Sequence, residues 1–174
     1  MEIDELIETV KLHGKSVYGF CYKLARNKED ADDLYQDTFL KAVELKARMD
    51  VNGNPKAFLI SIAIRLHKNH RRKLAWRFRI APTANLEEAA AMPDLFAAGA
   101  TPEDTVLSLE LRTIIQEAAY RLNDKLKLPL YMYYTADMSI EEIALALKIP
   151  EGTVKSRLHK ARATMRKVLE VDPL

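Results

Sequence analysis

The chain has 174 residues and a formal net charge of +2, with 27 Lys and Arg against 25 Asp and Glu. This length fits one ordinary domain or two small ones of roughly 70 to 80 residues each. No apolar run approaches the length of a membrane span, and Glu2, Asp4 and Glu5 stand where a signal peptide would be basic. Cys21 is the only cysteine, which excludes a disulfide framework and predicts a small buried side chain. These features favour a cytoplasmic protein without membrane insertion.

Charge is segregated along the chain. Asp and Glu are absent from residues 51–86 and 152–169, whereas they are frequent in residues 29–37 and 87–110. The small net charge hides this pattern. The segregation predicts separate positive and negative docking surfaces.

The first half of the chain predicts three helices. The first covers residues 3–26, with Gly14 as a point of bending. Asn27 is a suitable N-cap for a second helix that reaches about residue 46. The run MDVNGNP then breaks the chain, and Pro55 suits the first turn of a third helix that ends at about residue 79.

The second half predicts a linker and four more helices. Residues 80–104 hold three prolines and no Lys or Arg, so we assign a flexible linker to residues 80–101, with one helical turn near residues 86–92. Helices are predicted over residues 102–122, 124–135, 139–147 and 151–169, the third with a capping box of Ser139 and Glu142. We therefore expect an all-α fold with two small helical domains, residues 1–79 and 102–174, the second containing a helix-turn-helix.

The last predicted helix is strongly basic. Val154, Leu158, Ala161 and Met165 share one face at 100° per residue, which makes an apolar stripe, and the opposite arc is cationic. A merely solvated helix would interleave Glu for i,i+4 pairs, and none is present over residues 152–169. The pattern favours a DNA-binding helix that enters the major groove. The residues predicted to contact DNA are Thr153, Lys155, Ser156, Arg157, His159, Lys160 and Arg162.

A family resemblance is visible in this segment. The run SIEEIALALKIPEGTVKSRLHKARATMRK resembles region 4 of bacterial RNA polymerase sigma factors, especially the small two-domain, extracytoplasmic-function (ECF) group. The resemblance implies that the segment binds the promoter's −35 element. Lys148 stands in the turn where glycine is common, so we expect a left-handed backbone there at a cost of about 1 kcal/mol.

The N-terminal half carries the second part of the resemblance. The run NKEDADDLYQDTFLKAVE is similar to sigma regions 2.1 to 2.2, whose surface docks on core RNA polymerase. An outward Leu40 rimmed by carboxylates is typical of a protein interface. The residues expected to bind polymerase are Asp33, Gln36, Asp37, Leu40 and Glu44.

The acid-free third helix resembles sigma regions 2.3 to 2.4, which melt and capture the −10 element. Its run NPKAFLISIAIRLHKNHRRK combines an apolar stripe with many cations suited to phosphate, and the loop over residues 48–54 matches one that holds a flipped base. Arg65 and Asn69 stand where Asn and Asp are expected, and Phe58 where Trp is frequent, so base preference is open. The residues expected to bind −10 DNA are Asn52, Asn54, Lys56, Arg65, Lys68, Asn69, Arg71, Arg72 and Lys73.

The sequence offers few residues for metal binding or catalysis. His67 and His70 lie three apart but have no further ligand nearby, so they favour nucleic-acid contact or solvation over a metal site. Trp76 can stack on a base, although packing at the end of the lobe is the favoured interpretation. No catalytic constellation, metal site or cofactor motif is predicted, which argues against an enzyme acting on nucleic acid or on a small-molecule substrate.

The resemblance implies a sigma factor that binds core RNA polymerase, recognises −35 DNA with its helix-turn-helix and melts the −10 element with its N-terminal domain. Core polymerase, promoter DNA and an inhibitory anti-sigma factor are the expected partners. The alternative left open is a stand-alone helix-turn-helix repressor or activator whose N-terminal lobe senses a ligand or dimerises.

Overall fold

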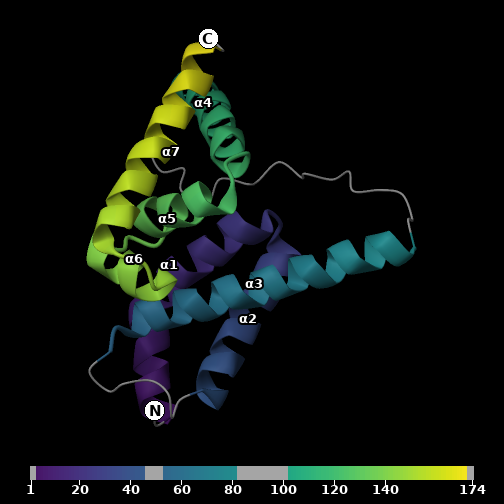
Figure 1. The fold of residues 1–174 in the computed structure, drawn as a ribbon, viewed down its shortest axis with the longest axis vertical. Coiled ribbons are helices and arrows are strands. Elements are labelled where there is room, and N and C mark those ends of the chain that lie inside the picture. The colour runs from purple at the N-terminus through teal and green to yellow at the C-terminus, as the bar shows by residue number, and fades with distance from the viewer. Residues whose placement is uncertain (1–2, 46–52, 82–101, 172–174) are drawn as a thin grey trace.

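The structure is a computed structural model that describes residues 3–45, 53–81 and 102–171 (Figure 1). Within those ranges it contains seven α-helices and no β-strand, so the predicted all-α fold class is confirmed. Asn52 and the helical turn expected near residues 86–92 lie outside the described residues. The linker prediction for residues 80–101 falls almost wholly outside them too.

Three helices form the N-terminal lobe: α1 (Ile3–Ala25), α2 (Lys28–Glu44) and α3 (Pro55–Ile80). The side-chain oxygen of Asn27 accepts a hydrogen bond from the Asp30 backbone N–H at 2.8 Å, so the predicted N-cap of α2 is confirmed. Asn54 caps α3 in the same way, directly before Pro55 in the first turn. Helices α2 and α3 thus each begin at an asparagine that satisfies one of the first unpaired N–H groups.

Fully buried side chains from all three helices fill the core of this lobe, among them Val17, Phe20, Leu59 and Ile60. Helix α1 runs through Gly14 without interruption. A Cβ atom at Gly14 would lie 2.8 Å from the Tyr35 hydroxyl, so the glycine permits close approach of α2. The buried residues of α2 are Ala31, Leu34, Thr38 and Ala42, which share one face of the helix.

The C-terminal lobe consists of α4 (Pro102–Tyr120), α5 (Asp124–Tyr134), α6 (Ile140–Leu147) and α7 (Glu151–Val171). The predicted capping box is present at the start of α6, where Ser139 and Glu142 each satisfy a backbone N–H of the other. Lys148 ends α6 with φ 55° and ψ 48°, which is the left-handed conformation expected there. Helices α6 and α7 therefore form the predicted helix-turn-helix.

Helix α7 packs on the other three helices of its lobe through one face. Val154, Leu158 and Ala161 are buried and Met165 is partly buried, which confirms the predicted apolar stripe. Ile143 of α6 is fully buried against the same core. This packing fixes the rotation of α7 about its axis, so the opposite arc must face away from the lobe.

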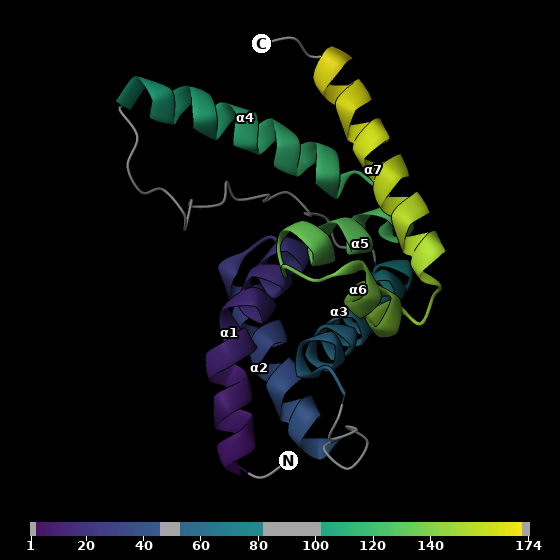
Figure 2. The ribbon, with the colours of Figure 1, turned by 90° about the vertical axis from the view of Figure 1, so that its left-hand side faces the viewer.

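The two lobes pack against each other. Helices α5 and α6 lie between α1 and α3 on one side and α7 on the other (Figure 2). Buried apolar side chains of both lobes belong to one contiguous cluster. The last turns of α3 project beyond this body, and Trp76 there is 65% exposed (Figure 1). The interpretation that Trp76 packs its lobe is therefore wrong, because nothing among the described residues covers the end of α3.

In the C-terminal lobe, truncation of a buried leucine should lower stability much more than truncation of an exposed one. Leu158 is 1% exposed and Leu145 is 60% exposed. We expect Leu158→Ala to lower the free energy of unfolding by about 2 to 5 kcal/mol, because it leaves a cavity. The matched control Leu145→Ala should change it by about 0.5 kcal/mol or less. Urea unfolding followed by circular dichroism measures both, and equal losses would contradict the packing of α7.

Candidate nucleic-acid interface

The first turns of α7 present the predicted DNA-binding side chains to solvent. Five of them are exposed, and Thr153 and Arg157 are half-buried. The exposed residues are Lys155, Ser156, His159, Lys160 and Arg162. The five exposed residues face away from the buried stripe, and the half-buried Thr153 and Arg157 flank them. This arrangement gives closely spaced donors and positive charges to a phosphate backbone or a base edge.

A groove of about 440 Å³ lies beside this arc, where the start of α5 meets the start of α7. It is lined by Asn123, Lys125, Leu126, Gly152, Thr153, Ser156, Arg157 and Lys160. Lys125 adds a third cation to Arg157 and Lys160. Sequence reasoning missed Lys125 because no local pattern indicates that the first turn of α5 lies beside α7.

Two tyrosines of α5 hold one of the predicted DNA-binding arginines. The Arg162 Nε donates a hydrogen bond to the Tyr134 hydroxyl at 2.8 Å, and its guanidinium lies over the rings of Tyr133 and Tyr134. Both tyrosines are exposed. These contacts reduce the conformational freedom of Arg162 before any ligand binds. The adjacent aromatic pair is the only local feature of the sequence that points to these contacts.

The predicted polymerase-binding residues share one exposed face of α2, which we call the docking face: Asp33, Gln36, Asp37, Leu40 and Glu44. Leu40 is 64% exposed at its centre, and the neighbouring Val43 is exposed too. At the C-terminal end of the docking face, the Lys41 Nζ forms an ion pair with the Glu44 carboxylate at 2.5 Å. An apolar centre with a charged rim matches the composition of a protein interface.

The predicted −10 residues that the structure describes lie along α3. Six side chains are exposed and form a cationic strip: Arg65, Lys68, Asn69, Arg71, Arg72 and Lys73. Asn54 and Lys56, at the start of the helix, are half-buried. The strip also borders a larger groove of about 890 Å³, which reaches Asp33 and Asp37 of the docking face. Cations of α3 and acids of α2 thus face a common opening.

The start of α3 is in contact with the C-terminal lobe. The Asn54 side chain accepts a hydrogen bond from the Ala57 N–H at 3.0 Å and donates one to the carboxylate of Glu142. Lys56 donates to the backbone carbonyls of Ala136 at 3.2 Å and Asp137 at 2.8 Å. Both side chains are therefore engaged in this structure, and Asn54 also caps a helix.

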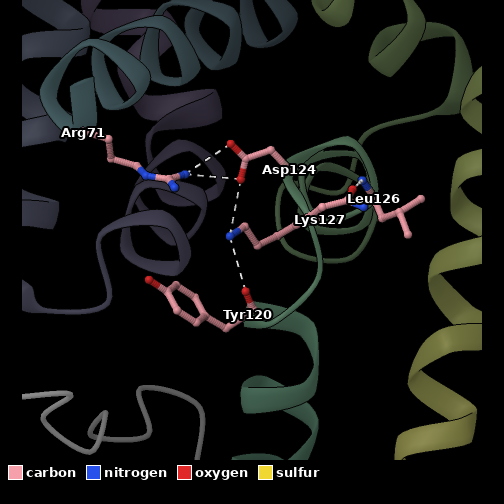
Figure 3. Close-up of polar contacts among 6 residues, drawn as sticks. Arg71, Tyr120, Asp124, Leu126 and Lys127 are labelled. Carbon is pink, nitrogen blue, oxygen red and sulfur yellow. Dashed lines mark hydrogen bonds and ion pairs between the residues drawn. The ribbon is translucent and has the colours of Figure 1, made fainter. Parts of the chain in front are cut away.

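A second contact lies further along α3. Arg71 donates to both carboxylate oxygens of Asp124, at 3.3 and 3.2 Å, and Lys127 pairs with the same carboxylate at 3.5 Å (Figure 3). Lys127 also donates to the Tyr120 carbonyl at 3.4 Å. Partial burial raises the pKa of Asp124, but the two cations outweigh it and hold that pKa below its ordinary value. Asp124 is thus an anion fixed between the lobes.

His67 is half-buried beside this contact. Burial, and next to it the charge of nearby Arg71, lowers the pKa of its imidazole to about 4. His67 is thus only partly solvated, whereas His70 is exposed, and their contact with nucleic acid stays a prediction. Among the described residues, no group of three or more His, Cys, Asp and Glu side chains could hold a metal ion. Cys21 is buried as predicted, which raises the pKa of its thiol to about 12.

Two cationic helices on separate lobes, with an acidic and apolar face beside one of them, define a nucleic-acid-binding protein with two DNA-facing sites and a protein-docking surface. Comparisons with known proteins narrow this class. Residues 9–77 match the model of sigma-70 region 2, and residues 112–165 match that of sigma-70 region 4. The chain belongs to the ECF RNA polymerase sigma factors. It therefore directs promoter recognition by RNA polymerase through these two regions and is not an enzyme in its own right.

Individual relatives agree with this assignment. The chain is 32% identical to the ECF RNA polymerase sigma factor SigW of Bacillus subtilis, over 95% of this chain and 89% of that protein. It is 28% identical to the ECF RNA polymerase sigma-E factor of Salmonella typhimurium, over 83% of this chain and 75% of that protein. The fold is similar to the sigma factor RpoE crystallised with the anti-sigma factor NepR from Bartonella quintana, with a TM-score of 0.78 at 22% identity, covering 98% and 100% of the two chains.

The match to region 2 also favours a sigma factor over a stand-alone helix-turn-helix regulator. A stand-alone repressor or activator would need an N-terminal lobe that senses a ligand or dimerises, whereas residues 9–77 are accounted for as sigma-70 region 2. None of the described helices combines the length and the apolar character needed to cross a bilayer.

The low pKa of His67 predicts a loss of stability in mild acid. The unfolded chain takes up a proton near the ordinary value of 6.5, but the folded imidazole resists protonation until about 4, so stability falls as the pH drops through this window. We expect His67 to account for a loss of about 2 kcal/mol between pH 7.5 and pH 5.

Urea unfolding at both pH values tests this expectation. His67→Gln should reduce the pH dependence by about that amount, and His70→Gln, at an exposed position, should leave it unchanged. The pKa of His13 is also lowered, mainly by burial, so part of the dependence should remain in His67→Gln. An unchanged dependence in His67→Gln would contradict its burial between the lobes.

Proposed function

We propose that this sigma factor divides promoter recognition between α7, which binds the −35 element, and α3, which binds and melts the −10 element. The observation that carries this proposal is the separation of charge from core on both helices. In each, a buried apolar stripe fixes the rotation, and a mainly cationic arc faces away from it, with Glu151 and Glu170 near the ends of α7 as the only acids on the two helices. The two helices belong to different lobes, as two separated promoter elements require.

The −35 site consists of the seven predicted residues of α7 together with the groove beside them. We propose that Lys125 contacts the DNA backbone in this groove, because it adds a cation at the edge of the arc. Arg162 lies on the same surface, and its side chain is already held by a hydrogen bond to the Tyr134 hydroxyl. A cation held in place loses less conformational entropy on binding than a free one.

The −10 site consists of the cationic strip of α3, with Asn52, Asn54 and Lys56 at its start. The exposed cations suit the phosphates of a separated strand. The exposed ring of Trp76, three residues beyond Lys73, supports stacking on a base. The loop before α3 would accept the flipped base, a step that costs a few kcal/mol of unstacking energy.

The docking face of α2 is proposed to bind core RNA polymerase. Its exposed Leu40 and Val43 supply apolar area, and its carboxylates select a basic partner surface. We further propose a cytoplasmic location, where polymerase and promoter DNA reside. The structural neighbours RpoE and CnrH were solved in complex with NepR and with the cytosolic domain of CnrY, which supports an anti-sigma factor as a partner for this chain as well.

Transcription with purified core polymerase tests the function directly. Adding the chain should produce transcripts with defined 5′ ends from genomic DNA that core polymerase alone does not produce. Asp33→Lys with Asp37→Lys should weaken assembly with the polymerase about tenfold or more, because like charges would then face the partner's basic surface.

A charge-matched control is available on α1. Asp4→Lys with Glu8→Lys makes the same change of charge at exposed positions outside the docking face. This variant should assemble like the wild type. Equal assembly of all three proteins would refute the docking assignment, and an absence of new transcripts with the wild type would refute the function.

The −35 assignment predicts a specific loss of promoter binding. Lys155→Ala with Lys160→Ala should weaken binding of the holoenzyme to a promoter fragment and reduce its salt slope by about 2, since two phosphate contacts are lost. Arg166→Ala with Lys167→Ala removes the same charge further along α7 and should have a smaller effect. Titrations at several salt concentrations measure the slopes, and identical behaviour of the two variants would contradict a localised site.

A further inference from the structure

The partner of Arg162 differs in charge from the partners of two other arginines. Arg26 and Arg71 each pair with a carboxylate on another helix. Arg162 instead donates its Nε–H to the neutral hydroxyl of Tyr134 at 2.8 Å. Among the described residues no carboxylate lies within ion-pair distance of Arg162. The guanidinium is therefore held in place while its positive charge stays uncompensated.

Two aromatic rings fix the position of this guanidinium. Its central carbon lies 5.4 Å from the centroid of the Tyr133 ring and 5.5 Å from that of Tyr134. The two rings pack edge to face, with their centroids 5.0 Å apart. The helix that carries them is anchored, because the run from Lys127 to Met132 is buried. Both tyrosines are exposed at its end, so a ligand in solvent can reach them and the arginine without moving α5.

The two side chains keep hydrogen-bond donors available for a ligand. A guanidinium carries several N–H donors, and the hydrogen bond to Tyr134 occupies only one of them. The Tyr134 hydroxyl accepts in that bond, so its own O–H can still donate. Among the described residues neither the Nη groups of Arg162 nor the Tyr134 O–H has an acceptor. A guanidinium beside a hydroxyl, both with unused donors, suits the oxygens of a phosphate.

Arg162 and Tyr134 lie on the opposite side of α7 from the groove at Lys125. At 100° per residue, Arg162 stands about 80° to one side of the buried Val154, and Arg157 stands about 60° to the other side. Arg157 lines the groove with Lys125 at the start of α5, whereas Arg162 contacts Tyr134 at the end of α5. Helix α5 packs against α7 and therefore presents one of its ends on each side of that helix.

The spacing of these two ends matches the width of a major groove. Lys125 and Tyr134 are nine positions apart on α5, so roughly 14 Å of helix axis separates them. The major groove of B-DNA is about 12 Å wide, and a recognition helix inside it has one phosphate strand on each side. With α7 in the groove, Lys125 and Tyr134 therefore lie beside different strands.

We infer that Tyr134 and Arg162 together bind one backbone phosphate of the −35 DNA, on the strand opposite the one contacted at Lys125. The inference rests on the −35 assignment proposed above, and it adds a tyrosine of α5 as a direct ligand of the DNA. The guanidinium supplies the charge, and the hydroxyl supplies a donor at a fixed place beside it. Helix α5 thus contacts both walls of the major groove, which limits the depth and the angle at which α7 enters it.

Methylphosphonate interference tests this site with the holoenzyme. Each phosphate around the −35 element of a promoter found by the transcription assay is replaced, one at a time, by a neutral methylphosphonate in a fluorescein-labelled duplex, and anisotropy measures binding. We expect one such replacement to weaken wild-type binding about tenfold, because it removes the charge that Tyr134 and Arg162 contact. Tyr134→Phe should bind the unmodified duplex about tenfold less tightly, and the same replacement should then have an effect of about twofold or less.

Tyr133→Phe is the matched control. It removes the hydroxyl of the neighbouring exposed tyrosine and leaves both rings beside Arg162. Within the described part of the chain, the contacts of Tyr133 are those of its ring, so this variant should give the wild-type affinity and interference profile. Equal losses in Tyr133→Phe and Tyr134→Phe would overturn the site, as would a wild-type interference profile in Tyr134→Phe.

Two further variants test the two ends of α5 separately. Arg162→Ala should lose its response at the same phosphate as Tyr134→Phe, and it takes the place of that variant if circular dichroism shows that Tyr134→Phe folds poorly. Lys125→Ala should lose its response at a phosphate of the other strand. Losses at phosphates of one and the same strand would overturn the inference that α5 contacts both walls.

The same titrations distinguish this site from the proposed function. If binding needs Lys155 and Lys160 but its interference profile does not depend on Tyr134 or Arg162, the phosphate site alone is refuted. If binding to the promoter fragment needs neither lysine, the proposed −35 role of α7 is refuted.

Discussion

Both DNA-facing surfaces arise from one constraint, which is that a small helical lobe must bury one apolar stripe of each helix and can bury almost no charge. In α7 the stripe of Val154, Leu158 and Ala161 points into the core, and every cation of the helix must then face the other way. The same holds for α3, where Leu59, Ile60 and Ala63 are buried. Because α3 contains no acid and α7 contains only Glu151 and Glu170 near its two ends, each outward arc is mainly cationic.

Glu142 of the helix-turn-helix is in direct contact with the N-terminal lobe. Partial burial raises the pKa of its carboxyl, but hydrogen bonds from the Ser139 N–H and from Asn54, with Lys56 nearby, outweigh burial and lower it. The same carboxylate thus stabilises the start of α6 and holds the start of α3. Any movement that frees Asn54 leaves the capping box intact, so the lobes can separate without unfolding the helix-turn-helix.

Features set by neighbours in sequence could be predicted, whereas features set by contacts between the lobes could not. The cap at Asn27, the capping box at Ser139 and the left-handed Lys148 depend on a few adjacent residues, and all three are found. The partial burial of His67 and the exposure of Trp76 depend on which helix ends lie beside α3; the first was not predicted, and the packing expected for Trp76 was wrong. Helical periodicity shows which residues share a face but does not identify what lies opposite that face.

The same limit applies to the candidate sites. The arc of α7 follows from periodicity alone, but Lys125 and Tyr134 join it only because α5 packs across the start and middle of that helix. The docking face of α2 is likewise periodic and exposed. By contrast, the pairing of Arg71 with Asp124 spans 53 positions, and no local pattern relates the two.

Two weak DNA sites on one chain give strong, specific binding only when both can be engaged together, because the second contact then forms at a high effective concentration. On this chain the two cationic arcs belong to different lobes, so the gain depends on how the lobes are placed relative to each other. The docking face lies on α2, on neither of the two cationic helices, so a large partner can bind there while both arcs stay exposed. A partner that fixes the placement of both lobes favours promoter recognition by the assembled holoenzyme over recognition by the free protein.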